Sequence, residues 1–201
     1  NCEFYPDSYY FEPTTSGSAA KTSVDFVRDH KSKVQRTATQ SPMANTYTQL
    51  YFQIVFAVKN RDALISKVWQ EKLHGYITGI VQNHGHKMLS INSMPDHVHM
   101  LIGYNHTKLL PDLIENVKTS SNDYIKINQL SRFKFEWQKG YGAFSYSRSQ
   151  IPIVAKYIEN QETHHRKKSF RAEYLELLRK FEVEYDERYV FEFFDDVQGW
   201  E

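Results

Sequence analysis

Two segments typical of β-strands, residues 87–94 and 98–104, are joined by little more than Pro95 and Asp96. Antiparallel strands can be joined by such a tight turn, whereas parallel strands need a crossover of a dozen or more residues. The short joint therefore favours an antiparallel pair. Side chains alternate between the two faces of a strand, so His97 and His99 are predicted to lie on the same face.

The rest of the chain alternates between strand and helix patterns. A run rich in β-branched and aromatic residues predicts a first strand, and Ser66 is a plausible N-cap for a first helix. The order β-α-β-β-α-β is that of the ferredoxin-like sandwich, an α+β fold with an antiparallel sheet, here followed by C-terminal helices. The further predicted elements are a first strand at 47–58, helices at 66–84 and 109–129, a fourth strand at 133–137, a third helix capped by Ser149 at 150–165, and a fourth helix at 169–181.

The charge is divided unevenly along the chain. Residues 43–181 contain 19 Lys and Arg against 11 Asp and Glu, a net charge of +8, whereas residues 182–201 carry a net charge of −7. We predict an N-terminal appendage at 1–42, which need not be native, a basic domain at 43–181 and an acidic C-terminal tail at 182–201. A basic domain suits a polyanionic partner, although a solvated basic surface would have the same charge.

The composition argues against a membrane or disulfide-rich protein. No apolar run approaches the roughly 20 residues that a membrane-spanning helix needs. The N-terminus lacks the pattern of a signal peptide, and the single cysteine, Cys2, excludes an internal disulfide. We expect a soluble protein of a reducing compartment.

Two pairs of residues could form a reactive site. His97 and His99 can both reach one divalent ion, although an isolated His-x-His is often structural. In a helix at 150–165, Tyr157 and Gln161 would lie one turn apart on one face and present a phenol nucleophile beside an amide oxygen. His164 or His165 could replace Gln161 as the third metal ligand, and Asp96 could assist the metal or merely cap the turn.

Several segments together resemble one family, the one-tyrosine transposases of small bacterial insertion sequences and their repeat-associated domesticated relatives. The stretch from Met94 to Ile102 resembles their His-hydrophobe-His (HUH) motif. Ala57 stands where such proteins often have a polar residue. The other matching segments, in the same order as in that family, are 55–61, 117–121, 137–144 and 156–165.

The resemblance implies a metal-dependent nuclease that cuts and rejoins single-stranded DNA through a 5′-phosphotyrosine, often at hairpin ends. By position, Tyr157 would be the nucleophile, and His97, His99 and Gln161 would hold Mg²⁺ or Mn²⁺. The resemblance further implies a homodimer with composite sites, in which Tyr157 of one subunit faces the histidines of the other. It also implies a bacterial, cytoplasmic and nucleoid-associated protein.

Basic and hydroxyl side chains near the matching motifs are candidate contacts to DNA phosphates, although ordinary helix surface has the same composition. These candidates are Lys59, Arg61, Lys118, Ser120, Ser121, Arg148 and Lys156. One alternative function is a non-catalytic module that binds single-stranded nucleic acid on an aromatic-rich sheet. Another is a zinc-dependent hydrolase, for which the sequence offers no clear carboxylate base.

Overall fold

The computed structural model describes residues 47–194, apart from residues 61 and 63. The predicted appendage at 1–42 lies outside the described residues, as does Arg61. The elements are β1 (Leu50–Ala57), α1 (Lys67–Asn83), β2 (Lys87–Ser93), β3 (His97–Tyr104), α2 (Leu110–Ile127), β4 (Gly142–Ser145), the 3-10 turn η2 (Arg148–Gln150), α3 (Ile151–Glu159), α4 (Gln161–His165), α5 (Phe170–Lys180) and the 3-10 turn η3 (Glu187–Tyr189).

The four strands form one antiparallel sheet in the spatial order β2-β3-β1-β4. With α1 and α2 inserted between the strands, this is the βαββαβ order of the ferredoxin-like sandwich. The predicted α+β fold class is therefore confirmed. The tight joint at Pro95 and Asp96 does connect an antiparallel pair, β2 and β3.

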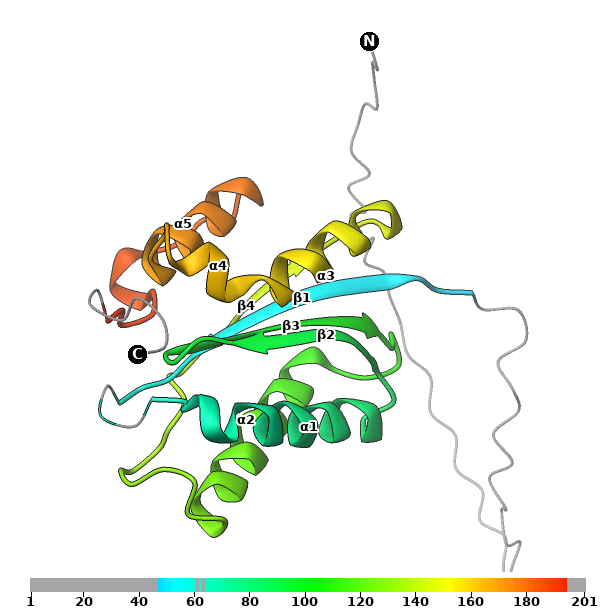
Figure 1. Cartoon of the computed structure of the whole chain (residues 1–201). Coiled ribbons are helices and arrows are strands. Elements are labelled where there is room, and N and C mark those ends of the chain that lie inside the picture. The colour runs from blue at the N-terminus through cyan, green and yellow to red at the C-terminus, as the bar shows by residue number, and fades with distance from the viewer. Residues whose placement is uncertain (1–46, 61, 63, 195–201) are drawn as a thin grey trace, which may run out of the picture. The chain divides into compact units, whose positions relative to one another are not determined.

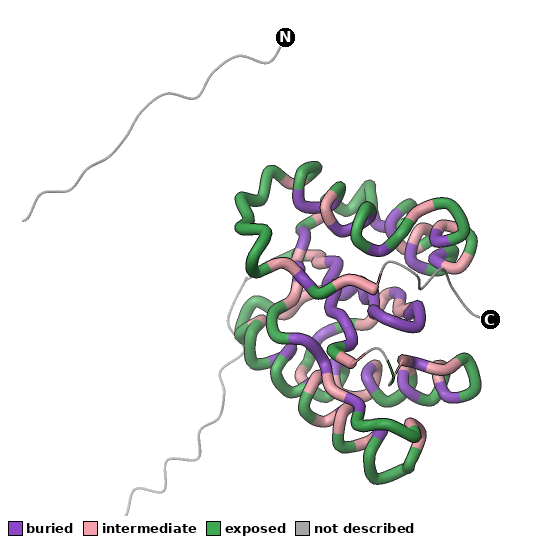
Figure 2. Tube along the Cα trace, turned by 90° about the vertical axis from the view of Figure 1, so that its left-hand side faces the viewer, coloured by how far each residue is buried: buried purple, intermediate pink, exposed green. Residues whose placement is uncertain are grey.

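Helices cover both faces of the sheet: α1 and α2 lie on one face, and α3, α4 and α5 lie on the other (Figure 1). Buried residues follow the strands and the inner sides of these helices (Figure 2). On the α1 and α2 side, alternate strand residues such as Ile54, Phe56 and Met100 join a continuous apolar core with Leu73 and Val117. Burying such side chains contributes about 1.5–3 kcal/mol each, so this layer holds the fold together.

The other face carries smaller apolar clusters around a polar centre. Val55 and Ala57 of β1 pack with Phe170, Tyr174 and further residues of α5. Tyr174 approaches β4 so closely that a Cβ added at Gly142 would lie 2.9 Å from its ring. Glycine at this position therefore allows α5 to pack against the edge of the sheet.

The predicted fourth strand at 133–137 is wrong, because β4 lies later, at Gly142–Ser145. Of the predicted segment, only Trp137 forms a β-bridge, and its partner is Val58, the residue that follows β1. Phe135 and Trp137 owe their apolar pattern to packing in the core, where both rings contact other aromatic side chains edge to face. Between the bridge and β4 the chain leaves β1, and Gly140 adopts a φ of +77° there.

The predicted third helix is divided in two. Helix α3 ends at Glu159, and Asn160, with φ −96° and ψ 21°, separates it from α4. Ser149 does not cap the helix; Ser147 forms a capping box with Gln150 one turn earlier. The predicted cap Ser66 is confirmed, since its side chain accepts a hydrogen bond from the Val68 N–H. Ser169, where the fourth helix was predicted to begin, also caps its helix, by accepting from the Ala172 N–H.

The described part of the acidic tail packs against the domain. Phe191 and Phe193 lie against Phe170 of α5. The Gln138 side chain donates to the Glu192 carbonyl at 2.7 Å and accepts from the Glu192 N–H at 2.8 Å. Among the described residues, no helix is long and apolar enough to cross a membrane.

Candidate active site

His97 and His99 both point from β3 to the face covered by α3–α5, and both are fully buried. Their antiparallel partners on β1 are Ala57 and Val55. The ring of Phe170 from α5 stacks on His97, with centroids 3.9 Å apart and planes 5° from parallel. The strand alternation predicted from the sequence therefore places both imidazoles side by side beneath α5.

The Nδ1 atom of each histidine is engaged by a neighbouring polar group. His97 Nδ1 lies 2.7 Å from Asp96 Oδ1, so it can donate to the carboxylate and keep its Nε2 lone pair free. His99 Nδ1 lies 2.9 Å from the Gln53 amide, which also accepts a hydrogen bond from the Tyr146 hydroxyl. The Gln53 amide can turn over to present either its nitrogen or its oxygen to His99 Nδ1, and the Tyr146 hydroxyl can donate or accept to match. The pair can therefore hold His99 in either tautomer. Such partners orient metal-binding histidines.

The Nε2 atoms of His97, His99 and His165 converge on the carboxylate of Glu173. The potential ligand atoms of these residues all lie within 4.8 Å of one another, and all the residues are buried. The three Nε2 atoms and Glu173 Oε2 make no hydrogen bond. Because buried polar atoms almost always have partners, and because imidazole nitrogen and carboxylate oxygen are metal ligands, these residues fit a divalent metal ion.

Tyr157 and Gln161 meet at the other oxygen of the same carboxylate, Oε1, which also lies 3.8 Å from His164 Nε2. The Tyr157 hydroxyl donates to Glu173 Oε1, and Gln161 Nε2 donates to the same oxygen at 3.0 Å. Gln161 is fully buried, and its Oε1 has no hydrogen-bond partner. The break at Asn160 does not separate the two side chains, so the predicted pairing of phenol and amide on one surface is present.

Burial keeps His97 and His165 neutral near pH 7. It lowers the pKa of His97 to about 3, with the neighbouring His99 acting in the same direction. Burial likewise lowers the pKa of His165 to about 3, and it raises the pKa of Asp96 to about 6. Neutral imidazoles keep the lone pairs that a metal ion requires.

Tyr157 lies where two surface clefts meet. One cleft, of about 240 Å³, is lined by Tyr146, Tyr157, Glu173 and Lys180 among others. The second is lined by Lys156, Tyr157, Lys167 and Lys168, together with polar and apolar neighbours. The nucleophile candidate is therefore open to solvent on a basic surface, while the histidines behind it are enclosed.

The predicted DNA contacts fall into separate groups. Lys156 is exposed beside Tyr157, and Arg148 is exposed in η2, with its guanidinium 6.0 Å from the centre of the Tyr51 ring. Lys59 is exposed and pairs with Glu136 at 3.0 Å. Lys156 is thus the predicted basic contact that lies at the candidate active site.

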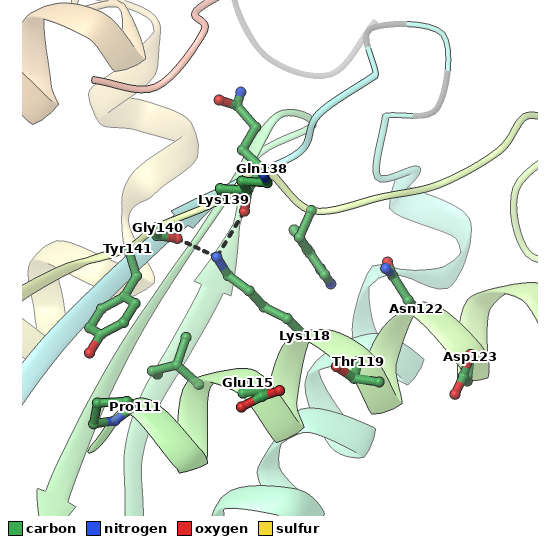
Figure 3. A pocket seen from close by; sticks show the side chains of 12 residues that line it. Pro111, Glu115, Lys118, Thr119, Asn122, Asp123, Gln138, Lys139, Gly140 and Tyr141 are labelled. Atoms are coloured by element: carbon green, nitrogen blue, oxygen red, sulfur yellow. Dashed lines mark hydrogen bonds between the residues drawn. The ribbon is translucent and has the colours of Figure 1, made fainter. Parts of the chain in front are cut away.

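Lys118, Ser120 and Ser121 lie on α2, which covers the opposite face of the sheet from the histidines (Figure 1). Lys118 Nζ donates to the carbonyls of Gln138 and Gly140 in a pocket between α2 and the loop before β4 (Figure 3). Burial lowers the pKa of Lys118 to about 8. Its ammonium group therefore holds the loop before β4 against α2, by bonding two carbonyls of that loop.

The two serines also bond within the protein. Ser120 Oγ donates to the Asn116 side chain at 3.0 Å. Ser121 is fully buried, donates to the Val117 carbonyl and accepts from Trp137 Nε1 at 2.9 Å. The structure corrects the predicted role of Ser121, because its buried hydroxyl is part of the core packing and is not presented to DNA.

Glu173 is the residue that sequence analysis missed. It lies on the buried side of α5 with Phe170, Tyr174 and Leu177. The sequence did contain a signal for it, because Glu173 stands at helical spacing among the apolar residues that α5 buries. A charged residue is almost never fully buried unless it has a partner, so a carboxylate at such a position indicates a polar site. His165 had been weighed only as an alternative to Gln161, and the structure brings both residues to the site.

The comparisons with known proteins agree on one family. A family model described as "Transposase IS200 like" matches residues 46–161, more than half of the chain. This span contains His97, His99, Tyr157 and Gln161 but ends before His165 and Glu173. The chain is 25% identical over 118 residues to the ISDra2 transposase TnpA of Deinococcus radiodurans, covering 56% of this chain and 84% of that protein.

Two solved structures are similar in part. One is a protein of Deinococcus radiodurans assigned as a transposase, with 21% identity, a TM-score of 0.47, and coverage of 61% of this chain and 97% of that chain. The other is a REP-associated tyrosine transposase bound to a REP hairpin, with 12% identity, a TM-score of 0.45, and coverage of 80% of this chain and 98% of that chain.

Proposed function

We propose that this chain, which belongs to the IS200-like transposase family, cleaves and rejoins single-stranded DNA through Tyr157. Proteins of this family carry out DNA transposition, and the proposal proceeds from that premise. The observation that carries the proposal is the position of the Tyr157 hydroxyl. It bonds one oxygen of Glu173, whose other oxygen lies 3.3 Å from His99 Nε2. A nucleophile and a set of metal-binding atoms thus share one site.

In the proposed reaction the phenolic oxygen of Tyr157 attacks the scissile phosphorus and its proton passes to Glu173 Oε1. The bond from phosphorus to the strand's 3′ oxygen breaks, and that oxygen takes up a proton from solvent to become a hydroxyl. The product is a 5′-phosphotyrosine, which conserves the energy of the phosphodiester, so a free 3′-hydroxyl can reverse the step and join a different strand. Tyrosine has a reference pKa of about 10. The hydrogen bond to Glu173 Oε1 directs the departing proton away from the approaching phosphate.

The metal predicted from the resemblance has suitable residues here. His97, His99 and Gln161 would hold it, through two Nε2 atoms and one amide oxygen that all lack hydrogen-bond partners. When bound, Mg²⁺ or Mn²⁺ supplies Lewis-acid polarisation of the phosphate and reduces its repulsion of the nucleophile. Asp96 and Gln53 orient the imidazoles by engaging their Nδ1 atoms.

The proposed substrate is single-stranded DNA, with hairpin ends as the recognised form. The supporting feature is the basic surface at Tyr157, formed by Lys156, Lys167 and Lys168. Exposed lysines contribute the salt-dependent, sequence-independent part of DNA binding. A cytoplasmic, nucleoid-associated location is part of the same proposal.

The homodimer with composite sites stays a prediction. In the chain described, Tyr157 already lies at its own His97 and His99 by way of Glu173. Mixing Tyr157→Phe protein with His97→Ala protein separates the arrangements, once subunit exchange is confirmed. Recovered cleavage would support composite sites, whereas no recovery at any ratio would support sites built from one chain.

The test of the function is to trap the protein on end-labelled single-stranded DNA. The wild-type protein is expected to form an adduct that resists denaturation and disappears with a chelator. Tyr157→Phe keeps the ring and removes the oxygen, so it should form no adduct. Tyr189→Phe, at a tyrosine 83% exposed in the tail, is the matched control and should react normally. A wild-type adduct level in Tyr157→Phe would exclude the proposed nucleophile.

A further inference from the structure

We propose that Glu173, on the helix beyond the family match, is both a metal ligand and the residue that positions the nucleophile. Its Oε2 would bind the metal ion with His97, His99 and His165, while its Oε1 holds the Tyr157 hydroxyl. This inference rests on the proposed function, because it deepens the role of the same site. It adds α5, and His165 of α4, to an active site otherwise formed by β3, α3 and Gln161 at the start of α4.

The distances around Glu173 Oε2 are those of atoms that share one ion. Oε2 lies 3.0 Å from His165 Nε2, 3.3 Å from His99 Nε2 and 3.7 Å from His97 Nε2. Ligand atoms about 2.1 Å from a metal ion are separated by roughly 3.0–3.4 Å at octahedral or tetrahedral angles. Oε2 therefore lies at or near coordination spacing from the three Nε2 atoms, and the potential ligand atoms of the four residues all lie within 4.8 Å of one another.

The charge of Glu173 also calls for a cation. Its side chain is 2% exposed, and its ion-pair partners among the described residues are all histidines. None of these partners is a lysine or an arginine, the residues that ordinarily carry a positive charge at pH 7. A buried carboxylate without a positive partner costs several kcal/mol in proteins, and a divalent ion at Oε2 would remove that cost.

The second oxygen of Glu173 fixes the groups that face the substrate. Oε1 accepts from both the Tyr157 hydroxyl and Gln161 Nε2. Because the amide nitrogen of Gln161 faces Glu173, the amide oxygen is left free as a donor to the metal. One carboxylate thus sets the position of the nucleophile, the orientation of Gln161 and the spacing of both from the histidines.

The donor set changes the expected metal preference. Mg²⁺ prefers oxygen ligands and keeps several waters, whereas three imidazoles and a carboxylate suit Mn²⁺, Co²⁺ or Zn²⁺. We therefore expect the isolated protein to bind Co²⁺ much more tightly than Mg²⁺. Two histidines and one amide would discriminate less between the two ions.

Two carboxylates of α5 provide the test. Glu173→Gln keeps the size and an acceptor oxygen but removes the charge; Glu176→Gln is the matched control, one turn along, where the side chain is 59% exposed. Co²⁺ is titrated into the metal-free full chain, and its visible absorption spectrum reports the ligand set. Adduct formation is measured separately at saturating metal and saturating DNA.

Glu173→Gln is expected to weaken Co²⁺ binding by about 10- to 100-fold and to change the spectrum. At saturating metal it should slow adduct formation by at least about 10-fold with unchanged affinity for DNA. Glu173→Asp, which restores the charge, should recover part of the Co²⁺ affinity. If Glu173→Gln fails to fold, the Co²⁺ spectrum of Glu173→Asp decides the metal role, since a shortened ligand must alter it.

Co²⁺ affinity and spectrum in Glu173→Gln equal to those of Glu176→Gln would overturn the metal role. An unchanged adduct rate at saturating metal would overturn the positioning role. Failure of the proposed function looks different, because Tyr157→Phe would then still form the adduct. Tyr157→Phe should itself keep its Co²⁺ affinity, so the metal measurements stand apart from the nucleophile.

Discussion

The two faces of the sheet are built from the same strands but bury opposite kinds of side chain. Towards α1 and α2, Val98 and Met100 of β3 enter a core made of apolar residues. Towards α3–α5, the alternate residues His97 and His99 enter a layer with imidazole, amide and carboxylate groups. Adjacent residues of one strand thus contribute to the apolar core on one face and to a group of potential metal ligands on the other.

The two faces also differ in whether their buried polar atoms have hydrogen-bond partners. The apolar face gains free energy from the area it removes from water. The site face contains nitrogen and oxygen atoms that are buried without hydrogen bonds, including Nε2 of both histidines and Oε2 of Glu173. Such atoms cost stability in the metal-free protein. The site face therefore depends on a ligand in a way that the apolar face does not.

The largest expected effect comes from His99→Ala on the site face. Removing one imidazole should reduce adduct formation by at least about 100-fold, because it removes a ligand atom from a site assembled as a unit. DNA binding, measured by fluorescence anisotropy, should stay within about 3-fold of wild type. Adduct formation near the wild-type rate in both His99→Ala and His97→Ala would rule out the metal site.

The neighbouring residue tests the other face. Met100→Ala should lower the free energy of unfolding by roughly 2–5 kcal/mol, since Met100 is fully buried in the apolar core and its loss leaves a cavity. Urea denaturation measures this change. The adduct rate of the folded fraction should be nearly unchanged. A specific loss of activity without loss of stability would contradict the separation of the two faces.

Acid should destabilise the metal-free protein through the site face. The pKa values of His97 and His165 are lowered to about 3, so the unfolded chain binds these protons below about pH 6.5 and the folded chain does not. The raised pKa of Asp96, about 6, acts in the opposite direction. Together these three groups take up a net of about one proton on unfolding, so their contribution to stability falls by about 1.4 kcal/mol per pH unit between about pH 6 and about pH 4. Burial also lowers the pKa of His74 to about 4 and lowers that of His164, and both add to the fall.

Urea denaturation in the presence of a chelator measures this dependence. His165→Gln removes one histidine contribution and should make the dependence less steep by about 1.4 kcal/mol per pH unit in the same range. Addition of Co²⁺ should make the dependence steeper at the acidic end, because protons compete with the metal for the imidazoles. A metal-free curve in His165→Gln as steep as that of wild type would show that His165 does not titrate as expected.

The smallest expected effect compares two lysines on opposite faces. Lys156→Ala removes an exposed charge beside Tyr157 and should reduce the slope of log affinity against log salt by about 0.7, the value for one phosphate contact with single-stranded DNA. Lys118→Ala should change this slope less and the unfolding midpoint more, because Lys118 Nζ is bonded to the Gln138 and Gly140 carbonyls. The opposite ranking would place the DNA on α2.

Local pattern was sufficient for much of the fold. The tight joint at Pro95 and Asp96 determined that β2 and β3 are antiparallel, and strand alternation determined that His97 and His99 share a face. The serine cap of α1 was predicted as well, because a cap depends on hydrogen bonds within one turn of the helix. The prediction of a strand at 133–137 was wrong because this segment is a loop whose aromatic side chains pack into the core. Such a loop has the aromatic-rich composition that is also typical of a strand.

The site itself was determined in part by the sequence and completed only by the tertiary structure. The order of motifs identified His97, His99, Tyr157 and Gln161 as a group. The packing of α5 against β1 and β4 decided that Glu173 stands among them, 12 residues beyond Gln161. A charged residue within an apolar helix stripe shows that a partner must exist. Which partner it meets depends on contacts between distant segments, and these arise only when the sheet and the helices pack together.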